Sequence, residues 1–396
     1  MKLYHSKSLL LYNRILLKMV TINQIVTATK SEKSLIAKQN LEKFVKKIDR
    51  EFVDYFDYQI KNAFGVSRKE KKLSLHVIRH IKEHCLRPAK RIRGSFVYYG
   101  YKLLKNNNDK EITKAAMSIE LIHTALLMHD DFMDQDDTRR GLPTTHEYYK
   151  KFHITNNFRF SSLHYGESMA VTVGDIALLM GYEILGQANF NNSYKLLALN
   201  RTLRGVVNTA HGQTFDITLE GVGHASEKDI TDLHLAKTAI YTYENPLHIG
   251  AILAGATKND LELISKYAIP GGVAFQLQDD ILGLYGDPIK TGKPAHSDLR
   301  QGKMTLLIIK ALELGNENQK NKLMEIWGKR NLSETEANVA RQIVRETGSL
   351  DYSRNVSVKW AKKAQKAIPE MIKRGWNNNA VGYLDGIAQY MVERNY

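Results

Sequence analysis

One short acidic stretch carries the strongest chemical signal in the sequence. Asp134 follows Asp130 by four residues and Asp131 by three, so a helix places the three carboxylates on one side. Neighbouring carboxylates repel one another unless a cation compensates them. Mg²⁺ is bound by a few carboxylates while substrate phosphate completes its coordination, so this stretch predicts a magnesium site. The alternative is a solvated acidic helix end that Arg139 and Arg140 cap.

A second apolar segment ends in a similar group of polar side chains. Gln276, Asp279 and Asp280 stand at positions i, i+3 and i+4, and they therefore share one helix face. Two helices that each close in an acidic pair predict one metal cluster between them, assembled in the core of a helical bundle. Two unrelated, exposed helix ends are the alternative.

Two basic clusters accompany these acids. Lys90, Arg91 and Arg93 precede an apolar stretch, and Arg139 with Arg140 follows the first acidic cluster. Arginine matches phosphate geometry with two parallel hydrogen bonds, and lysine supplies a mobile point charge. The combination fits two diphosphate groups, one bound through metal and one bound by salt bridges. Each basic cluster taken alone is also typical of a solvated surface.

Helices must position these groups, because apolar residues recur at helical spacing along most of the chain. Seven prolines in 396 residues favour long helices, and no strand alternation or hairpin pattern appears. We therefore expect an all-α protein, a single-domain bundle of about ten or more helices. Residues 141–144 are expected to form a turn, residues 150–165 a surface excursion and residues 285–302 a loop. Helices are expected over residues 34–61, 73–86, 112–136, 169–187, 195–220, 229–253, 260–284, 304–314, 334–347 and 356–391, the last with a turn near Trp376.

The composition is that of a globular protein with excess positive charge. The formal net charge is +15, and over half of it lies in residues 1–50. No uninterrupted apolar run approaches the roughly 18 residues that a membrane span needs. A single cysteine, Cys85, excludes an intramolecular disulfide and a cysteine-based metal site. We interpret residues 1–33 as a basic, poorly ordered leader, with a targeting role left open, and residues 34–396 as one domain. A nucleic-acid partner is not expected, because no groove-reading motif accompanies the charge.

The motifs together resemble those of the trans-isoprenyl diphosphate synthases, or polyprenyl synthetases, which join prenyl units head to tail. The resemblance covers residues 86–307 well and the flanking helices only in general character. It implies the isoprenoid synthase fold around a deep apolar cavity, Mg²⁺ as cofactor, and isopentenyl diphosphate and an allylic diphosphate as substrates. We also expect a cytoplasmic homodimer without a transmembrane segment, which contacts membranes transiently for product release. The motifs, in order, are Lys90-Arg91-x-Arg93, His123, Asp130-Asp131-x-x-Asp134, Arg139-Arg140-Gly141-x-Pro143-Thr144, Gly174-Asp175, Gly212-Gln213-x-x-Asp216, Lys237-Thr238, Gln276-x-x-Asp279-Asp280, Gly292-Lys293 and Gly302-Lys303-x-Thr305.

The resemblance assigns roles to the matching positions. The carboxylates that hold Mg²⁺ are matched by Asp130, Asp131, Asp134, Asp279 and Asp280. The cations that grip the allylic diphosphate are matched by Arg139, Lys237, Lys293 and Lys303. The pocket for isopentenyl diphosphate is matched by Lys90, Arg93, His123 and Arg140. The reaction centre is matched by Lys237, Thr238 and Gln276.

The chain departs from the family pattern at three places. Pro88-Ala89 stands where the family has Gly-Gly, and Gly94 replaces a proline, so a differently shaped loop is expected there. Gly283 replaces the third aspartate of the second motif, so metal binding through that helix is expected to rest on two carboxylates. We expect activity to be retained. A class I terpene cyclase and a non-catalytic helical partner subunit of a prenyl synthase stay open as alternatives.

Product length is expected to depend on the helix turn that precedes Asp130. In the family, a large aromatic residue at the position of Ala125 stops the growing chain. Ala125, with Leu126 beside it, is small and leaves the tunnel open. We therefore expect a geranylgeranyl or longer product, with farnesyl diphosphate as the alternative.

Overall fold

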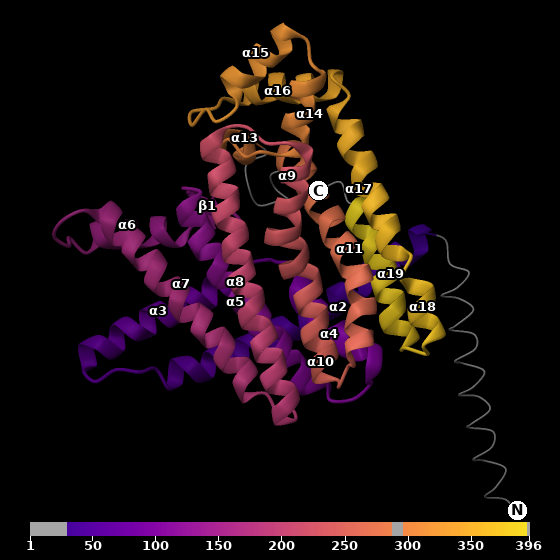
Figure 1. The fold of residues 1–396 in the computed structure, drawn as a ribbon. Helices are drawn as coiled ribbons and strands as arrows, with labels where there is room; N and C mark the ends of the chain where they lie inside the picture. Colours follow the sequence, from indigo (N-terminus) through magenta and orange to yellow (C-terminus); the bar gives the residue numbers. More distant parts are fainter. Residues whose placement is uncertain (1–29, 287–295, 394–396) are drawn as a thin grey trace, which may run out of the picture.

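The computed structural model describes residues 30–286 and 296–393, which fold almost entirely into helices (Figure 1). The expected all-α class is confirmed. Within these ranges the β-structure is a short hairpin, in which β1 (Thr138–Arg139) pairs antiparallel with β2 (Leu142–Pro143). The helices are α2 (Lys30–Lys61), α3 (Arg68–Leu86), α4 (Ile92–Leu104), α5 (Asp109–Met133), α6 (Thr145–Thr155), α7 (Ser162–Gln187), α8 (Asn192–Val222), α9 (Glu227–Leu233), η1 (His234–Glu244), α10 (Asn245–Leu253), α11 (Lys258–Tyr285), α13 (Ser297–Gln301), α14 (Leu306–Leu314), α15 (Glu317–Ile326), α16 (Glu334–Glu346), α17 (Ser349–Gln365), α18 (Ile368–Lys373) and α19 (Asn378–Glu393).

The two helices that carry the acidic motifs, α5 and α11, lie inside the bundle. Helix α5 packs against α4 and α7, and it buries Leu121, Ile122 and Met128 completely. Helix α11 packs against η1 and α17. A capping box formed by Thr257 and Asp260 fixes where α11 begins. Burial on several sides holds both helices rigidly, so their acidic ends have defined positions.

Glycines bring α5 and α7 into close contact. A Cβ atom at Gly181 would lie 2.6 Å from Ile122 Cγ1, and one at Gly174 would collide with the His129 ring. Any larger residue at these positions must therefore push the helices apart. The seam between α5 and α7 is consequently tightly packed at these two points.

The helix predicted over residues 229–253 is interrupted by a π-helix. Helix α9 continues into η1, which ends one residue before α10, and Pro246 stands in the first turn of α10. Proline has no N–H to donate, and its ring clashes with the carbonyl four residues earlier, so regular α-helical bonding cannot run through this point. A π-helix is frequently found at functional sites, and this one carries Lys237 and Thr238.

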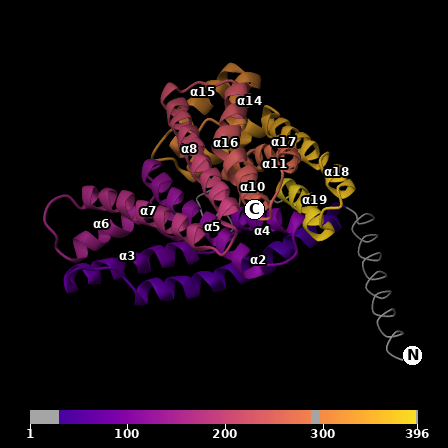
Figure 2. The same ribbon diagram turned by 60° about the horizontal axis from the view of Figure 1, so that its bottom comes forward.

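Two helical hairpins, α2–α3 and α6–α7, extend together to one side of the bundle (Figure 2). The rings of His76 on α3 and Phe152 on α6 lie 4.5 Å apart, and those of His80 and Tyr148 lie 4.3 Å apart. The residue number rises along α3 from His76 to His80 while that of the partner on α6 falls from Phe152 to Tyr148, so α3 and α6 are antiparallel neighbours. We call these two hairpins the arm.

Several element predictions need correction. Residues 145–155 form helix α6, so the expected surface excursion is partly helical. The second half of the expected 285–302 loop contains α13, and α4, α15 and the β1–β2 hairpin were not predicted. Residues 287–295 of that loop, and most of the predicted basic leader, lie outside the described residues.

Helix α7 is long and apolar enough to cross a membrane by length and composition alone. It carries three acidic residues, Glu167, Asp175 and Glu183, and it packs against α5, α6 and α8 in this fold. Core helices of water-soluble proteins pass the same test. One such helix in the described part of the chain is weak support for a membrane span.

Candidate active site

The two acidic helix ends open into one cavity of about 1400 Å³. Asp130 from α5 lines it, and so do Asp279 and Asp280 from α11. The α3–α4 loop, the β1–β2 hairpin, α8, η1 and α13 complete its wall. The arrangement expected from the sequence is therefore present: two acid-tipped helices share one enclosed space.

The three carboxylates at the end of α5 have different surroundings. Asp130 is partly exposed, and its Oδ1 lies 3.8 Å from Lys237 Nζ. Asp131 is fully buried behind it and accepts hydrogen bonds from the Arg139 guanidinium. Asp134 accepts a hydrogen bond of 2.8 Å from Lys303 Nζ. Of the three, only Asp130 lines the cavity directly.

The Arg139 pair stabilises the buried charge of Asp131. Burial opposes the charged form of Arg139, but Asp131, Asp130 and Asp136 outweigh it and raise the pKa of the guanidinium. Such a pair holds its geometry because separating it would leave a charge buried without a partner. Arg139 thereby fixes the end of α5 and the hairpin relative to each other.

The polar side chains at the end of α11 form a connected chain of hydrogen bonds. Thr238 Oγ1 donates to Gln276 Oε1 over 2.8 Å, and Gln276 Nε2 donates to Asp280 Oδ1 over 2.8 Å. His234 Nε2 lies 3.1 Å from the other oxygen of Asp280. The π-helix therefore orients Asp280 through two of its own residues, and no motif in the sequence pointed to the role of His234.

Lys237 and Lys303 lie among the acids of the cavity. Lys237 Nζ lies 2.5 Å from Asp216 Oδ2, and Asp130 and Asp216 raise the pKa of Lys237 although burial lowers it. Burial also opposes the charged form of Lys303, but Asp134 and its acidic neighbours hold the pKa of Lys303 well above its ordinary value. Burial, together with Asp216, raises the pKa of Glu220 to about 7. This side of the cavity is thus densely acidic, and both lysines stay charged.

The residues predicted to bind isopentenyl diphosphate form a basic group in the same cavity. Lys90, Arg93, His123 and Arg140 all line the cavity. Arg93 Nη1 lies 2.9 Å from His123 Nε2. Burial and Arg93 lower the pKa of His123 well below its usual value, so this ring is neutral. Burial and the nearby Arg91 lower the pKa of Arg140 to about 10, which marks a site with more cations than anions. Such a site attracts a phosphate group.

Gly94 has a structural reason for replacing the proline of the family. Its backbone N–H donates to Glu120 Oε1 over 2.7 Å, and a proline has no hydrogen to give. Arg91 also lines the cavity, and its guanidinium bonds Asp49 Oδ1 at 2.9 Å and the carbonyl of Cys85. These bonds of Arg91 anchor the loop that carries Lys90 and Arg93 at the cavity.

Asp298 occupies the space left free by Gly283. A Cβ atom at Gly283 would collide with Asp298 Oδ2, and both residues line the cavity. Helix α13, which carries Asp298, is tied to the end of α5 because Gln301 Nε2 donates to Asp136 Oδ1 over 2.7 Å. A carboxylate from α13 therefore stands beside the second motif, where the sequence predicted only two.

The two positions expected to set product length differ in location. Leu126 lines the cavity. Ala125 is fully buried in the hydrophobic cluster shared by α5 and α7 and is not part of the cavity wall. Its role in product length stays a prediction, as do the roles of the other site residues. Lys293 lies outside the described residues.

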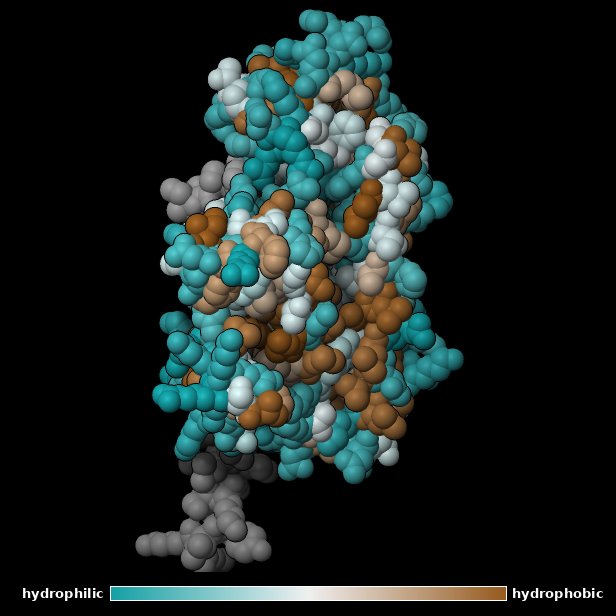
Figure 3. Space-filling model, turned by 90° about the vertical axis from the view of Figure 1, so that its left-hand side faces the viewer, coloured by the Kyte–Doolittle hydropathy of each residue, from teal (hydrophilic) through white to brown (hydrophobic). Residues whose placement is uncertain are grey.

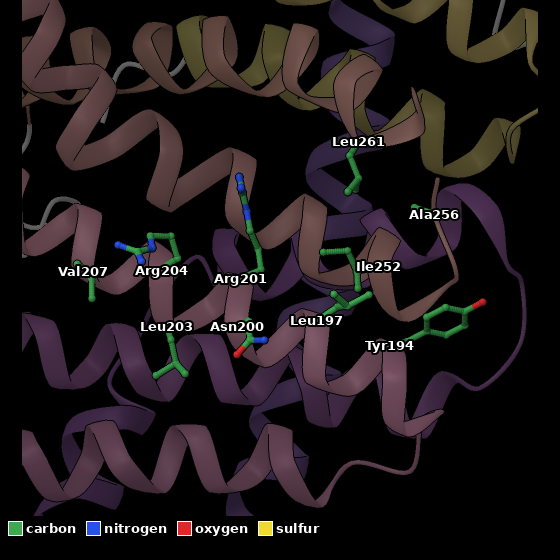
Figure 4. Close-up of a pocket in the computed structure, with 10 residues that line it drawn as sticks. All are labelled: Tyr194, Leu197, Asn200, Arg201, Leu203, Arg204, Val207, Ile252, Ala256 and Leu261. Carbon is green, nitrogen blue, oxygen red and sulfur yellow. The ribbon is translucent and has the colours of Figure 1, made fainter. Parts of the chain in front are cut away.

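A second hollow, of about 650 Å³, lies between α8 and the α10–α11 connection (Figure 4). Its walls include Leu197, Leu203 and Ile252, and Arg201 pairs with Glu244 at 2.6 Å. No carboxylate lines it. It does not have the chemistry of the first cavity.

Residues 75–345 match the polyprenyl synthetase family, which is more than half of the chain. The chain belongs to this family. The geranylgeranyl diphosphate synthase of Sulfolobus acidocaldarius is 35% identical over 259 residues, 65% of this chain and 73% of the relative. The short chain isoprenyl diphosphate synthase of Methanocaldococcus jannaschii is 31% identical, over 77% of this chain and 85% of the relative.

Solved structures agree with this assignment. A geranylgeranyl pyrophosphate synthase from Corynebacterium glutamicum, crystallised with isoprenyl diphosphate and magnesium, has a TM-score of 0.81 at 28% identity. The likeness covers 89% of this chain and 99% of the other. This polyprenyl synthetase is a prenyltransferase, and its fold is that of the known isoprenyl synthases.

Proposed function

We propose that this polyprenyl synthetase condenses isopentenyl diphosphate head to tail with an allylic diphosphate, and that geranylgeranyl diphosphate or a longer chain is the product. One observation carries the proposal: Asp130 and the Asp279–Asp280 pair line one cavity together with the basic residues Lys90, Arg93 and Arg140. The names of the relatives from Sulfolobus and Methanocaldococcus support the substrate class.

The donor chemistry of the cavity fits Mg²⁺. The acidic side offers carboxylate oxygens, which are hard ligands of the kind that this ion prefers. In the described ranges, no three histidine, cysteine or acidic side chains stand close enough to hold an ion by themselves. Diphosphate oxygens are therefore expected to complete the coordination around Asp130, Asp134, Asp279 and Asp280. When bound, the metal neutralises charge on the leaving diphosphate.

The residues of the chain perform the remaining tasks. Arg139, Lys237 and Lys303 hold the allylic diphosphate and stabilise the negative charge that develops as its C–O bond breaks. Lys90, Arg93 and Arg140 hold isopentenyl diphosphate, whose double bond attacks the allylic cation. The new cation then loses a proton to the released diphosphate, which restores a double bond. Apolar side chains such as Leu126 and Phe275 exclude water, which would otherwise convert the cation to an alcohol. The hydrogen-bonded chain from Thr238 through Gln276 presents oxygen dipoles near the cation.

Product analysis tests this function. Purified full-length protein is incubated with Mg²⁺, labelled isopentenyl diphosphate and an allylic primer, and the products are identified by mass spectrometry. We expect a chain of geranylgeranyl length or longer and no product without isopentenyl diphosphate. Hydrocarbon release without isopentenyl diphosphate would instead favour the cyclase, and complete inactivity would favour the non-catalytic subunit.

We also propose a homodimer. Helices α7 and α8 expose apolar side chains, among them Leu179, Leu196 and Leu203, and uncovered apolar surface of this kind is typical of protein interfaces. Sedimentation at several concentrations tests it: Leu196→Glu with Leu203→Glu should give a monomer. A cytoplasmic location stays a prediction, as does transient membrane contact for product release.

A further inference from the structure

The free end of the arm consists of two loops, residues 62–67 between α2 and α3 and residues 156–161 between α6 and α7. The His76–Phe152 ring contact places the start of α3 beside the end of α6, so the two loops lie at the same end of the arm. Both views of the fold show them projecting away from the bundle (Figures 1 and 2). We call residues 61–73 and 151–166 the arm tip.

The arm tip exposes large apolar side chains to water. Phe160 is 97% exposed, Val66 84% and Phe64 69%. Phe160 also has a φ of 73°, a conformation that is costly for a bulky residue. The loop around it is held in place, because Phe158 N donates to the His153 carbonyl and the His153 ring bonds the Arg159 carbonyl. A fixed loop thus presents an aromatic ring outward, with no burial in the described fold to stabilise it.

The arm tip is also strongly basic. It contains seven lysines and arginines but a single acidic residue, Glu70. In the described part of the chain none of the seven forms an ion pair, whereas the adjacent Lys150 is bound to Glu147 at 2.8 Å. The seven are Lys61, Arg68, Lys69, Lys71, Lys72, Lys151 and Arg159. Figure 3 views the molecule from the side on which the arm projects and shows brown apolar atoms mixed with teal hydrophilic ones on that face.

We propose that the arm tip docks on an anionic lipid bilayer. Aromatic rings favour the interface between lipid headgroups and hydrocarbon, and unpaired lysines and arginines are attracted to anionic headgroups. A bilayer satisfies both features at once. A nucleic acid would use the cations and leave Phe160 and Val66 in water. The biological role of this docking rests on the proposed function: a long prenyl product must pass from the protein into lipid, and docking would bring the protein to the bilayer.

Vesicle flotation of the full-length protein tests this proposal without any substrate. Vesicles of phosphatidylcholine with about one third phosphatidylserine supply the negative surface. We expect binding that falls with added salt and is weak on pure phosphatidylcholine. Lys69→Glu with Lys72→Glu should weaken binding by about tenfold or more, and Phe160→Ser with Val66→Ser by several fold.

The matched control reverses two exposed lysines on α17, Lys359→Glu with Lys362→Glu, which changes the net charge equally at a distance from the arm. All variants keep residues 1–33, whose own lysines and arginines then contribute equally. Unchanged binding by the arm-tip variants, or equal loss in the control, would overturn the proposal. So would loss of the dimer in Phe160→Ser with Val66→Ser, because the tip would then be covered by a second copy. Condensation activity in detergent should persist in every variant, which separates this test from that of the proposed function.

Discussion

Asp298 Oδ2 occupies the place that the first side-chain carbon of residue 283 would take, so Gly283 and Asp298 share one space in the cavity wall. The family usually has an aspartate at the position of Gly283. In this chain the additional carboxylate comes from α13, some fifteen residues further along. The second motif thus lacks its third aspartate, but Asp298 supplies a carboxylate in the same part of the cavity.

Restoring the family residue should therefore be harmful. In Gly283→Asp the new side chain must displace Asp298 and place two carboxylates side by side. We expect a loss of about 1–3 kcal/mol in the free energy of unfolding, measured by urea denaturation in metal-free buffer. The double variant Gly283→Asp with Asp298→Gly should recover most of it. A single variant as stable as the parent would show that the two residues do not compete.

Asp130 and Asp131 are adjacent, but their replacement should have different effects. Asp131→Asn leaves buried Arg139 without its main anionic partner, and we expect it to cost about 3 kcal/mol of stability as well as activity. Asp130→Asn should reduce kcat/KM at least about a hundredfold with little change in stability, because Asp130 is partly exposed. Chemical denaturation together with steady-state kinetics distinguishes them. Equal stabilities would contradict the structural role of the Asp131–Arg139 pair.

The buried histidines of α3 predict sensitivity to acid. Burial, with Arg87 and His76 nearby, lowers the pKa of His80 to about 3 from an ordinary value of 6.5. Above pH 6.5 the ring is neutral in both the folded and unfolded states, so it does not change stability. As the pH falls below 6.5, the unfolded state takes up a proton that the folded state refuses, and stability is lost.

The expected contribution of His80 is about 2 kcal/mol between pH 6.5 and 5. Urea unfolding at the two pH values measures it. His80→Gln, which cannot be protonated, should show a smaller loss over the same range, and the exposed His164→Gln serves as the control. If His80→Gln and the parent lose the same stability, the histidine is not the cause.

Product length should respond to Leu126 without damage to the fold. Leu126 lines the cavity, so Leu126→Phe is expected to shorten the product while the Tm stays within a few degrees of the parent. Ala125→Phe should also shorten it, but overpacking in the tightly packed seam between α5 and α7 should cost about 1–3 kcal/mol. Mass spectrometry of the products and thermal unfolding measure both effects. An unchanged product distribution in both variants would place the chain-length control elsewhere.

The sequence predicted most helices because their buried faces repeat at helical spacing, as in α5 and α11. It did not predict the π-helix η1, since one additional residue in a turn hardly alters an apolar pattern. Helix α6 was missed because it is short and has few aliphatic residues, and it is stabilised by contacts with α3, which lies far from it in the sequence.

In the candidate site, too, the sequence predicted some features and not others. The carboxylates and cations were found from their spacing and from family resemblance. Two of their partners, His234 and Asp298, were not found because they reach the cavity from separate elements, and the motif that contains Asp216 did not reveal its pairing with Lys237. A pairing such as Lys237 with Asp216 depends on how η1 and α8 cross, and no local pattern encodes that crossing.

Lys237, Lys303 and Arg139 each hold a carboxylate of the first motif or its neighbour Asp216. Cations of the protein therefore balance part of the acidic charge in the ligand-free cavity, which reduces repulsion between its carboxylates. Substrate arrival becomes an exchange of partners, in which cations pass from carboxylate to phosphate oxygens as the carboxylates pass to metal. Metal alone would leave the lysines and Arg139 without their carboxylates, and diphosphate alone would leave the carboxylates without a cation. Metal and diphosphate should therefore bind cooperatively, so that each ligand increases the affinity of the protein for the other.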